Sequence, residues 1–268
     1  MPDAKAGDVW RLLLSPPAKG AWNMAVDEAV LAAVGRGEAP PTLRLYAWSP
    51  PCLSLGRHQP PNEVDLARLR ARGWGMVRRP TGGRAILHTD ELTYAVIAPA
   101  EHPLMRGGVL PSYRRLAAGL LAALRALGVE ARMEGEHPPS AEAPPVCFEV
   151  PSSYELTVAG RKILGSAQAR RHGAVLQHGS LPLWGDLGRI ADALHFPDDA
   201  AREAARQAVR RRAITLSEAA GREVTWEEAA RAFWQGFSAA WGLRWSFGVL
   251  SEGEYADAVA RAATLSAR

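Results

Sequence analysis

The chain has 268 residues, of which 47% are hydrophobic and 22% are charged, and its formal net charge is +4. This balance is typical of a globular protein with one large domain, or one domain and a small appendage. No apolar run approaches the roughly eighteen residues that span a bilayer, and the N-terminus lacks a signal-peptide pattern. We therefore expect a cytoplasmic protein with no membrane partner. The short arginine clusters lack an aromatic binding pattern, so we expect no nucleic-acid partner.

Cysteine and lysine are both scarce. Cys52 and Cys147 cannot form a disulfide framework, and no His/Cys cluster has zinc-ligand spacing, so we expect no metal site. Of the 32 basic residues only Lys5, Lys19 and Lys162 are lysines. Where a positive charge alone suffices, the sequence uses arginine. A lysine in the middle of the chain is therefore a candidate for chemistry that arginine cannot perform.

The predicted elements mix strands and helices along the chain. In the first half, hydrophobic periodicity and turn residues predict strands at 9–15, 42–48, 52–56, 75–79, 84–88 and 92–98, and helices at 21–34, 63–72 and 113–127. A proline-rich loop at 137–145 precedes three predicted strands at 154–158, 162–169 and 174–182. Helices are then predicted at 188–195, 198–212, 226–241 and 251–265.

This order predicts an α+β fold with a mixed or antiparallel sheet flanked by helices. The regular strand–helix alternation of a doubly wound fold is missing. We expect a catalytic core over residues 1–185. The helical C-terminal segment, 186–268, should pack on that core and not form an independent domain.

Paired glycines occur between two predicted strands, in the segment Arg79 to Arg84 that also holds Thr81. Gly82 and Gly83 let the backbone approach a ligand closely and expose consecutive N–H groups, and the flanking arginines favour a negative ligand. A plain hairpin turn with solubilising arginines explains this segment equally well. The lysine and spacing of a P-loop are missing, so nucleotide binding does not follow.

Lys162 lies on a predicted central strand among small residues, which include Gly165, Ser166 and Ala167. An ammonium beside a reacting carbonyl can donate a hydrogen bond, stabilise a thiolate, or lose a proton when it is desolvated. A surface hairpin with a solvated lysine is the alternative. The scarcity of lysine argues against that alternative, and we favour a functional role.

Cys147 follows the proline-rich loop and begins a polar segment. A free cysteine is usually a small buried hydrophobic residue, and Cys52, in an apolar run, fits that description better than Cys147 does. To act as a nucleophile, Cys147 needs its pKa lowered from about 8.5, which a nearby Lys162 would achieve. His88 and His178 each end a strand before a polar turn. Either could line a pocket or carry a proton, although a lone histidine is more often structural.

Six segments, in order, resemble the lipoate/biotin protein ligase family. They are Asn23–Glu28, Leu43–Trp48, Leu55–Gln59, Arg79–Ala85, Arg161–Ala167 and His178–Leu181. Within that family, Cys147-Phe148-Glu149 followed by Pro151-Ser152 resembles the LipM-type octanoyltransferases, which carry a cysteine at this place. ATP-dependent lipoate ligases typically lack it.

The resemblance implies a biotin/lipoate-ligase-like catalytic domain that takes part in lipoate biosynthesis. Octanoyl would pass from acyl carrier protein to Cys147, and then to a lysine of a lipoyl domain such as the glycine-cleavage H protein. Lys162 would assist Cys147, and the Thr81–Gly83 backbone, with Arg79 nearby, would hold the acyl carbonyl. Exchange of one thioester for another is nearly isoenergetic, so we expect neither ATP nor a cofactor. The other expected substrate-binding residues are Arg84, His88, Gly165, Ser166, Ala167 and His178.

Three other functions compete with this hypothesis. An ATP-dependent lipoate–protein ligase would form an acyl-adenylate and would survive the loss of Cys147. An octanoyl amidotransferase would use the same cysteine chemistry with a lipoyl protein as donor. A non-catalytic lipoyl- or biotin-binding module needs neither Cys147 nor Lys162, so the presence of both argues against it.

Overall fold

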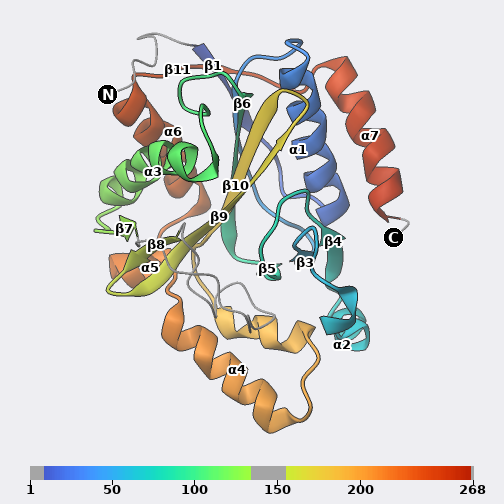
Figure 1. Cartoon of the computed structure of the whole chain (residues 1–268). Coiled ribbons are helices and arrows are strands. Elements are labelled where there is room, and N and C mark those ends of the chain that lie inside the picture. Colours follow the sequence, from blue (N-terminus) through green and yellow to red (C-terminus); the bar gives the residue numbers. More distant parts are fainter. Residues whose placement is uncertain (1–8, 134–154, 267–268) are drawn as a thin grey trace.

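The computed structural model describes residues 9–133 and 155–266, which form mixed sheets flanked by helices (Figure 1). The strands are β1 (Val9–Leu14), β2 (Thr42–Tyr46), β3 (Cys52–Leu55), β4 (Gly75–Arg78), β5 (Ile86–His88), β6 (Glu91–Pro99), β7 (Arg132–Met133), β8 (Glu155–Val158), β9 (Arg161–Arg171), β10 (Ala174–Pro182) and β11 (Arg244–Phe247). The α-helices are α1 (Gly20–Gly35), α2 (Leu66–Ala71), α3 (Val109–Ala126), α4 (Asp199–Arg212), α5 (Leu216–Ala220), α6 (Trp226–Trp241) and α7 (Glu252–Ser266). Two short 3-10 helices are η1 (Pro61–Glu63) and η2 (Leu187–Ala193).

The central sheet has the strand order β11-β1-β2-β6-β10-β9-β8-β7. β1 runs parallel to both β11 and β2, and each later neighbour pair is antiparallel. β10 is buried along its whole length, as expected for a strand covered on both faces. β9 and β10 form a hairpin, so Lys162 on β9 and His178 on β10 are held by the most continuous part of the sheet.

A smaller sheet has the order β4-β3-β5 and lies beside the central one. β3 pairs in parallel with β4 and in antiparallel with β5. The connection from β4 to β5 is the segment 79–85, which contains the paired glycines. The glycine loop is thus anchored at both ends by strands of this small sheet.

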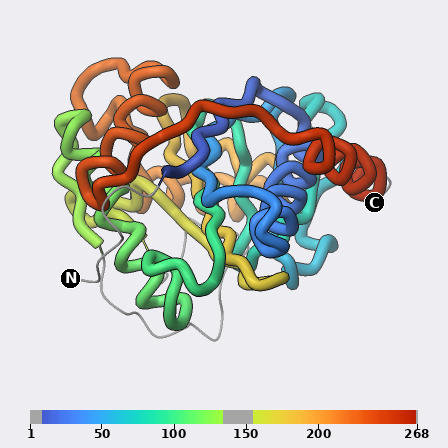
Figure 2. Tube along the Cα trace, turned by 90° about the horizontal axis from the view of Figure 1, so that it is seen from above, coloured from blue at the N-terminus to red at the C-terminus, as the bar shows by residue number. Residues whose placement is uncertain are grey.

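Helices cover both faces of the central sheet, as Figure 2 shows. On one face Tyr94 and Leu45 pack with α3 and α6 residues such as Leu120 and Phe233. On the other face, α1 and α7 pack over a second apolar cluster that includes Tyr46. A third cluster joins the small sheet to α2, η2 and α4. Burial of these apolar faces at about 25 cal/mol per Å² is the main stabilising contribution.

The predicted α+β fold, a mixed sheet flanked by helices, is confirmed. The expectation of helices alone beyond residue 185 is wrong at β11, a four-residue strand that pairs in parallel with β1. Such a short edge strand has too few residues for a period-2 signal, and its hydrogen-bonding partner lies at the opposite end of the chain. β7 and α5, which are also short, were not predicted either.

Within residues 9–133 and 155–266, no helix is both long and apolar enough to cross a membrane. The same part of the chain contains no group of three or more His, Cys, Asp or Glu side chains arranged to hold a metal ion.

Candidate active site

Arg79 is buried inside the glycine loop and shapes it. Its Nη1 donates to the carbonyl oxygen of Ser54 (3.0 Å) and to the Ser54 hydroxyl (3.2 Å). Its Nη2 donates to the carbonyl oxygens of Gly82 (2.8 Å) and Arg84 (2.7 Å), and Nε also reaches Gly82 (3.2 Å). These contacts orient the loop backbone. The predicted role of Arg79 next to an acyl carbonyl remains a prediction.

The two glycines of the loop have different environments. A Cβ at Gly82 would meet nothing within 4 Å, so this backbone is open to an approaching ligand. Gly83 has φ +92°, a conformation that L side chains rarely adopt, and a Cβ there would lie 2.8 Å from Arg79 Nη2. The turn therefore requires glycine at position 83 for its backbone conformation, and Gly82 leaves open space beside the backbone for a ligand.

A buried hydrogen-bonded chain joins the loop to α1. The Thr81 hydroxyl lies 2.7 Å from Nε2 of His178, and Nδ1 of His178 lies 3.1 Å from Oδ2 of Asp27. Asp27 also accepts hydrogen bonds from Arg44 Nη1 (2.7 Å) and from the Tyr46 hydroxyl (2.9 Å). The glycine loop is thus tied through His178 to a carboxylate in the protein interior.

The charge states of this chain follow from burial and from its neighbours. Burial acts to raise the pKa of Asp27, but Arg44 and His178 outweigh it, and the pKa is lowered. Burial lowers the pKa of His178 more than Asp27 raises it. We infer a neutral imidazole that donates Nδ1–H to the Asp27 carboxylate and accepts from Thr81 at Nε2.

His88 forms a second histidine–carboxylate pair. Its Nδ1 lies 2.7 Å from Oε1 of Glu91, its Nε2 lies 2.7 Å from the Ser54 hydroxyl, and its ring stacks on Trp48 with centroids 3.9 Å apart. The Ser180 hydroxyl donates to Oε2 of Glu91 at 2.5 Å. Burial acts to raise the pKa of Glu91, but His88 and the hydroxyl donors lower it overall. His88 therefore connects two parts of the site. Its Nε2 contacts Ser54, which accepts hydrogen bonds from Arg79, and its Nδ1 contacts Glu91, which accepts a hydrogen bond from Ser180.

Lys162 is 4% exposed, and its Nζ lies 2.5 Å from Oε1 of Glu155. A Cβ at Gly165 would lie 2.8 Å from Cε and 3.1 Å from Nζ of Lys162. The side chain thus crosses directly over Gly165, which has room for it only because it is a glycine. A solvated surface lysine, the alternative open from the sequence, is excluded.

A β-bulge aims Lys162 at this position. Leu164 pairs with Leu156 and Lys162 pairs with Thr157, so Ile163 has no opposite residue on β8. One extra residue reverses the alternation of side chains, and Lys162 points to the same face as Gly165. Ser180 is the direct partner of Gly165 on β10, and directly paired residues share a face. Lys162 therefore lies on the same face of the sheet as Ser180.

The expected substrate-binding residues fall on two faces of the sheet. Ala167 pairs with His178, so both share the face of Gly165 and Lys162. Ser166 points the other way, and its hydroxyl lies 2.6 Å from that of Tyr94. The structure therefore brings the glycine loop, His178, Gly165, Ala167 and Lys162 to one face but leaves the Ser166 side chain on the other.

Arg84 and Cys147 complete the expected set of site residues, and Cys52 was expected to lie in the core. Nη1 of Arg84 lies 3.4 Å from Oε1 of Glu63, at the rim of the loop. Cys147 lies outside the described residues, and its role stays a prediction. Cys52 is 2% exposed in the core, as expected, and burial raises the pKa of its thiol to about 12.

Three buried carboxylates of the site, Asp27, Glu91 and Glu155, were not predicted. Asp27 lies in the segment Asn23–Glu28, but it was given no role from the sequence. Its signal was weak, because Asp27 interrupts an apolar stretch but Arg44 takes an ordinary polar position in the alternating strand 42–48; only the structure shows that both are buried. Charges at two core positions need each other as partners. Glu91 and Glu155 border turns in the sequence, where a carboxylate is unremarkable.

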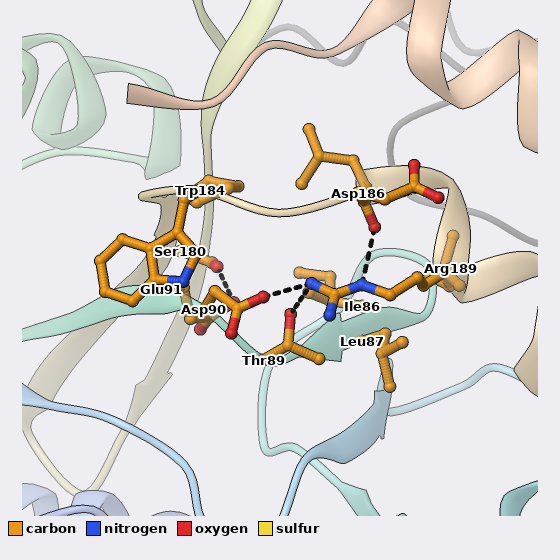
Figure 3. Close-up of a pocket in the computed structure, with 12 residues that line it drawn as sticks. Ile86, Leu87, Thr89, Asp90, Glu91, Ser180, Trp184, Asp186 and Arg189 are labelled. Atoms are coloured by element: carbon orange, nitrogen blue, oxygen red, sulfur yellow. Dashed lines mark hydrogen bonds and ion pairs between the residues drawn. The ribbon is translucent and has the colours of Figure 1, made fainter. Parts of the chain in front are cut away.

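A pocket opens beside Glu91 and Ser180 (Figure 3). On its polar side, Arg189 forms an ion pair with Asp90, contacts the Thr89 hydroxyl at 3.0 Å and donates from Nε to the Asp186 carbonyl at 2.9 Å. Its apolar wall is formed by Ile86, Leu87, Pro182, Trp184, Leu187 and Ile190. The site thus has an open, mixed apolar and polar depression next to the Lys162 face.

The fold that presents this site is that of the lipoate protein ligases. The chain superposes on a bi-partite lipoate protein ligase from Thermoplasma acidophilum with a TM-score of 0.80, at 25% identity, covering 96% of this chain and 92% of that one. A crystal structure of lipoate-protein ligase A bound with ATP matches with a TM-score of 0.78, at 25% identity, covering 95% and 94%.

The family model described as the lipoyl protein ligase A/B catalytic domain matches residues 19–238. Octanoyltransferase LipM of Kyrpidia tusciae is 45% identical over 251 residues, covering 91% of this chain and 92% of the relative. Octanoyltransferase LipM of Symbiobacterium thermophilum is 46% identical over 255 residues, covering 93% and 92%. The chain belongs to the lipoyl protein ligase A/B catalytic domain family, and the resemblance inferred from its six segments is confirmed.

Proposed function

We propose that this chain is an octanoyltransferase of lipoate biosynthesis that carries the octanoyl group on Cys147 and passes it to a lysine of a lipoyl-domain protein. The octanoyltransferase activity is supported by similar relatives that carry that name and match most of the chain. The main structural support for the proposed catalytic site is the buried ammonium of Lys162, which the bulge in β9 directs over Gly165.

The first half-reaction moves the acyl group from the donor to the enzyme. The Cys147 thiolate attacks the thioester carbonyl carbon, a new C–S bond forms, and the donor thiolate leaves and takes up a proton. One thioester replaces another, so the step needs no nucleotide. Lys162 stabilises the thiolate by its charge and donates a hydrogen bond to the oxyanion that develops on the carbonyl oxygen.

The second half-reaction forms the amide. The neutral amine of the acceptor lysine attacks the octanoyl–cysteine carbonyl, the new C–N bond forms, and Cys147 leaves as a thiolate. The amine gives up its extra proton, and the amide product is more stable than the thioester.

The loop and the sheet face supply the rest of the site. The open backbone at Gly82 suits close approach of the acyl carbonyl end, and Arg79 holds that backbone in place. Ala167 presents only a methyl group on the face of β9 that carries Lys162, which suits close approach of an extended chain. Burial of that chain contributes about 0.8 kcal/mol per methylene.

The donor that we propose is octanoyl-acyl carrier protein, and the acceptor is a lipoyl-domain protein of which the glycine-cleavage H protein is one form. We expect the reaction to take place in the cytoplasm. An ATP-dependent ligase on the same fold is the strongest competing function, since a ligase with this fold binds ATP.

The test is to mix the protein with octanoyl-acyl carrier protein without ATP and to weigh the intact chain. We expect an added octanoyl mass that hydroxylamine removes and that Cys147→Ser abolishes. Labelling that requires ATP would favour a ligase, and labelling that persists in Cys147→Ser would refute Cys147 as the carrier of the acyl group.

Lys162→Arg is the matched variant for the second role. It keeps the positive charge but brings a larger planar group that does not fit over Gly165. We expect loss of turnover with retention of the fold. Near-normal turnover in this variant would refute the role assigned to Lys162.

A further inference from the structure

Three arginines gather where the connection between β6 and α3 meets the far end of β9. Nη2 of Arg170 donates to the carbonyl oxygen of Met105 at 2.8 Å, and Nε of Arg115 donates to that of Leu104 at 3.1 Å. Arg115 also donates to the carbonyl of Arg106. Figure 2 shows the β6–α3 connection running past the β9–β10 hairpin. The arginine patch is defined as Arg106, Arg115 and Arg170.

Within residues 9–133 and 155–266, no carboxylate neutralises the charge of this patch by an ion pair. In the described part of the chain its hydrogen bonds go only to backbone carbonyls and the Ser112 hydroxyl, and none of the three forms an ion pair. The first turn of α3 also has no acidic residue. Burial lowers the pKa of Arg115, and the nearby charge of Arg170 lowers it further. Two like charges are therefore held close together without a carboxylate between them.

The arginines of α4 show the opposite arrangement. Arg206 pairs with Asp192 and Arg210 pairs with Asp186, both at short distance. The charges of the α4 arginines are therefore paired with carboxylates of the same chain, as is usual on a solvated helix face. The arginine patch leaves its charge available to a partner.

One member of the patch, Arg170, lies on the same strand as Lys162, but its side chain points to the face opposite Gly165, as that of Ser166 does. Arg170 follows Gly165 along β9, and at about 3.3 Å per residue the two lie roughly 17 Å apart. The next residue, Arg171, donates from Nη2 to the carbonyl oxygen of Pro80 at 3.0 Å. The end of β9 therefore contacts the glycine loop through Arg171, whose side chain lies on the face of Lys162, while Arg170 lies on the other face at the same strand end. A partner seated on the patch must extend an arm around this end of β9 to reach the acyl site.

We propose that the arginine patch docks the acyl donor, an acidic carrier protein that holds octanoyl as a thioester on a phosphopantetheine arm. This inference rests on the proposed function. A long arm lets the body of the donor sit a strand's length from Lys162 while its thioester reaches the site. An acceptor lysine spans only a few bonds, so the acceptor body must lie directly over the site and not on the patch.

The charge complementarity predicts faster association with an acidic donor at low salt. Arg106→Glu is the main variant, because Arg106 is exposed and its reversal leaves the core intact. Arg170→Gln removes the positive charge, whereas Arg170→Lys keeps it. Both variants replace the guanidinium, so comparing them separates the effect of charge from that of packing. Arg70→Glu, at an exposed arginine on α2, makes the same change in net charge and serves as control.

The experiment measures kcat/KM for loading the enzyme from octanoyl-acyl carrier protein and from octanoyl-pantetheine, which has the thioester but no carrier protein. We expect Arg106→Glu to lower the value for the carrier protein about tenfold and to weaken its salt dependence. Loading from octanoyl-pantetheine should stay unchanged. Arg170→Gln should show a smaller loss for the carrier protein, whereas Arg170→Lys and Arg70→Glu should resemble wild type with both donors.

Three outcomes overturn the inference. Arg106→Glu can leave loading from the carrier protein unchanged, it can slow both donors equally, or it can slow only transfer from the loaded enzyme to the acceptor. If wild type loads from octanoyl-pantetheine but never from the carrier protein, the docking inference fails while the transferase function stands. If neither donor loads Cys147, the proposed function itself fails.

Discussion

Nζ of Lys162 lies 2.5 Å from Oε1 of Glu155, and each side chain is only 5% exposed. The two residues lie on adjacent strands, and both are next to Gly165. Glu155 on β8 is the direct pairing partner of Gly165 on β9, and the Lys162 side chain passes over Gly165. Withdrawal of both charges from water is costly, and their mutual attraction offsets that cost only while the geometry holds. The ammonium is thereby fixed in position rather than free to rotate.

Glu155→Gln should therefore destabilise the protein by about 3 kcal/mol, because it leaves the Lys162 charge buried without its carboxylate. The double variant Glu155→Gln with Lys162→Met should be less destabilised than the sum of the two single variants, since it removes both charges. Urea unfolding measures all three. Additive losses would mean that the two charges do not stabilise each other.

Gly165→Ala tests whether the position of Lys162 matters apart from its presence. The new Cβ would lie 2.8 Å from Cε of Lys162, so the flexible end of the lysine must move. We expect acyl transfer to fall at least about tenfold, a barrier increase of about 1.4 kcal/mol, while the free energy of unfolding changes by less than that. Full activity in a correctly folded Gly165→Ala variant would show that the ammonium need not lie over this residue.

The two loop glycines give a matched pair of variants. Gly83→Ala should lower the free energy of unfolding by about 1–2 kcal/mol, because a residue with a side chain must adopt φ +92° and meet Arg79 Nη2. Gly82→Ala meets nothing within 4 Å, so its stability should stay within about 0.5 kcal/mol of wild type. If the substrate approaches this backbone closely, Gly82→Ala should still lose acyl loading. Unchanged loading would place the acyl carbonyl elsewhere.

The fold was largely predictable because its long elements carry their own signal. The strand 174–182 and the helices 198–212 and 226–241 were predicted with nearly their observed bounds, since periodicity and caps lie within each segment. β11 was missed because a four-residue strand is specified by its pairing with β1 rather than by its own sequence.

The site was predictable by residue type but not by geometry. The scarcity of lysine singled out Lys162, yet its orientation depends on the bulge at Ile163, which no local pattern reveals. Ser166 was grouped with Gly165 and Ala167 because they are neighbours, although alternation along a strand sends its side chain to the opposite face. The partners of His178 come from α1 and the glycine loop, and those of His88 come from β3 and β6, so they required the tertiary structure.

His178 should make stability depend on pH below neutrality. Burial lowers its pKa from the ordinary 6.5, and the charges of Arg79 and His88 add to that effect against the opposing effect of Asp27. Below pH 6.5 the unfolded chain binds a proton that the folded protein does not, so stability falls as pH falls from there toward the lowered pKa of the folded state. His178→Gln should flatten this slope by at most about 1.4 kcal/mol per pH unit.

The measurement is the free energy of unfolding in urea between about pH 5 and pH 8. The same substitution at an exposed histidine, His195→Gln, is the matched control. An identical slope for wild type and His178→Gln would contradict a neutral, buried His178. Asp27 acts in a lower range, because its pKa is lowered and the stability it contributes is lost only as pH falls below 3.8.

Cys52 should be inert while the protein is folded. Burial raises the pKa of its thiol to about 12, so almost no thiolate is present at pH 8, and its sulfur lies where a Cβ at Gly20 would come within 2.4 Å. Iodoacetamide at pH 8 should modify Cys147 and leave Cys52 unmodified until denaturant is added, as peptide mass analysis would show. Cys52→Ala should keep the octanoyl mass that Cys147→Ser loses. Loss of that mass in Cys52→Ala, with the fold intact by circular dichroism, would move the acyl group from Cys147 to Cys52.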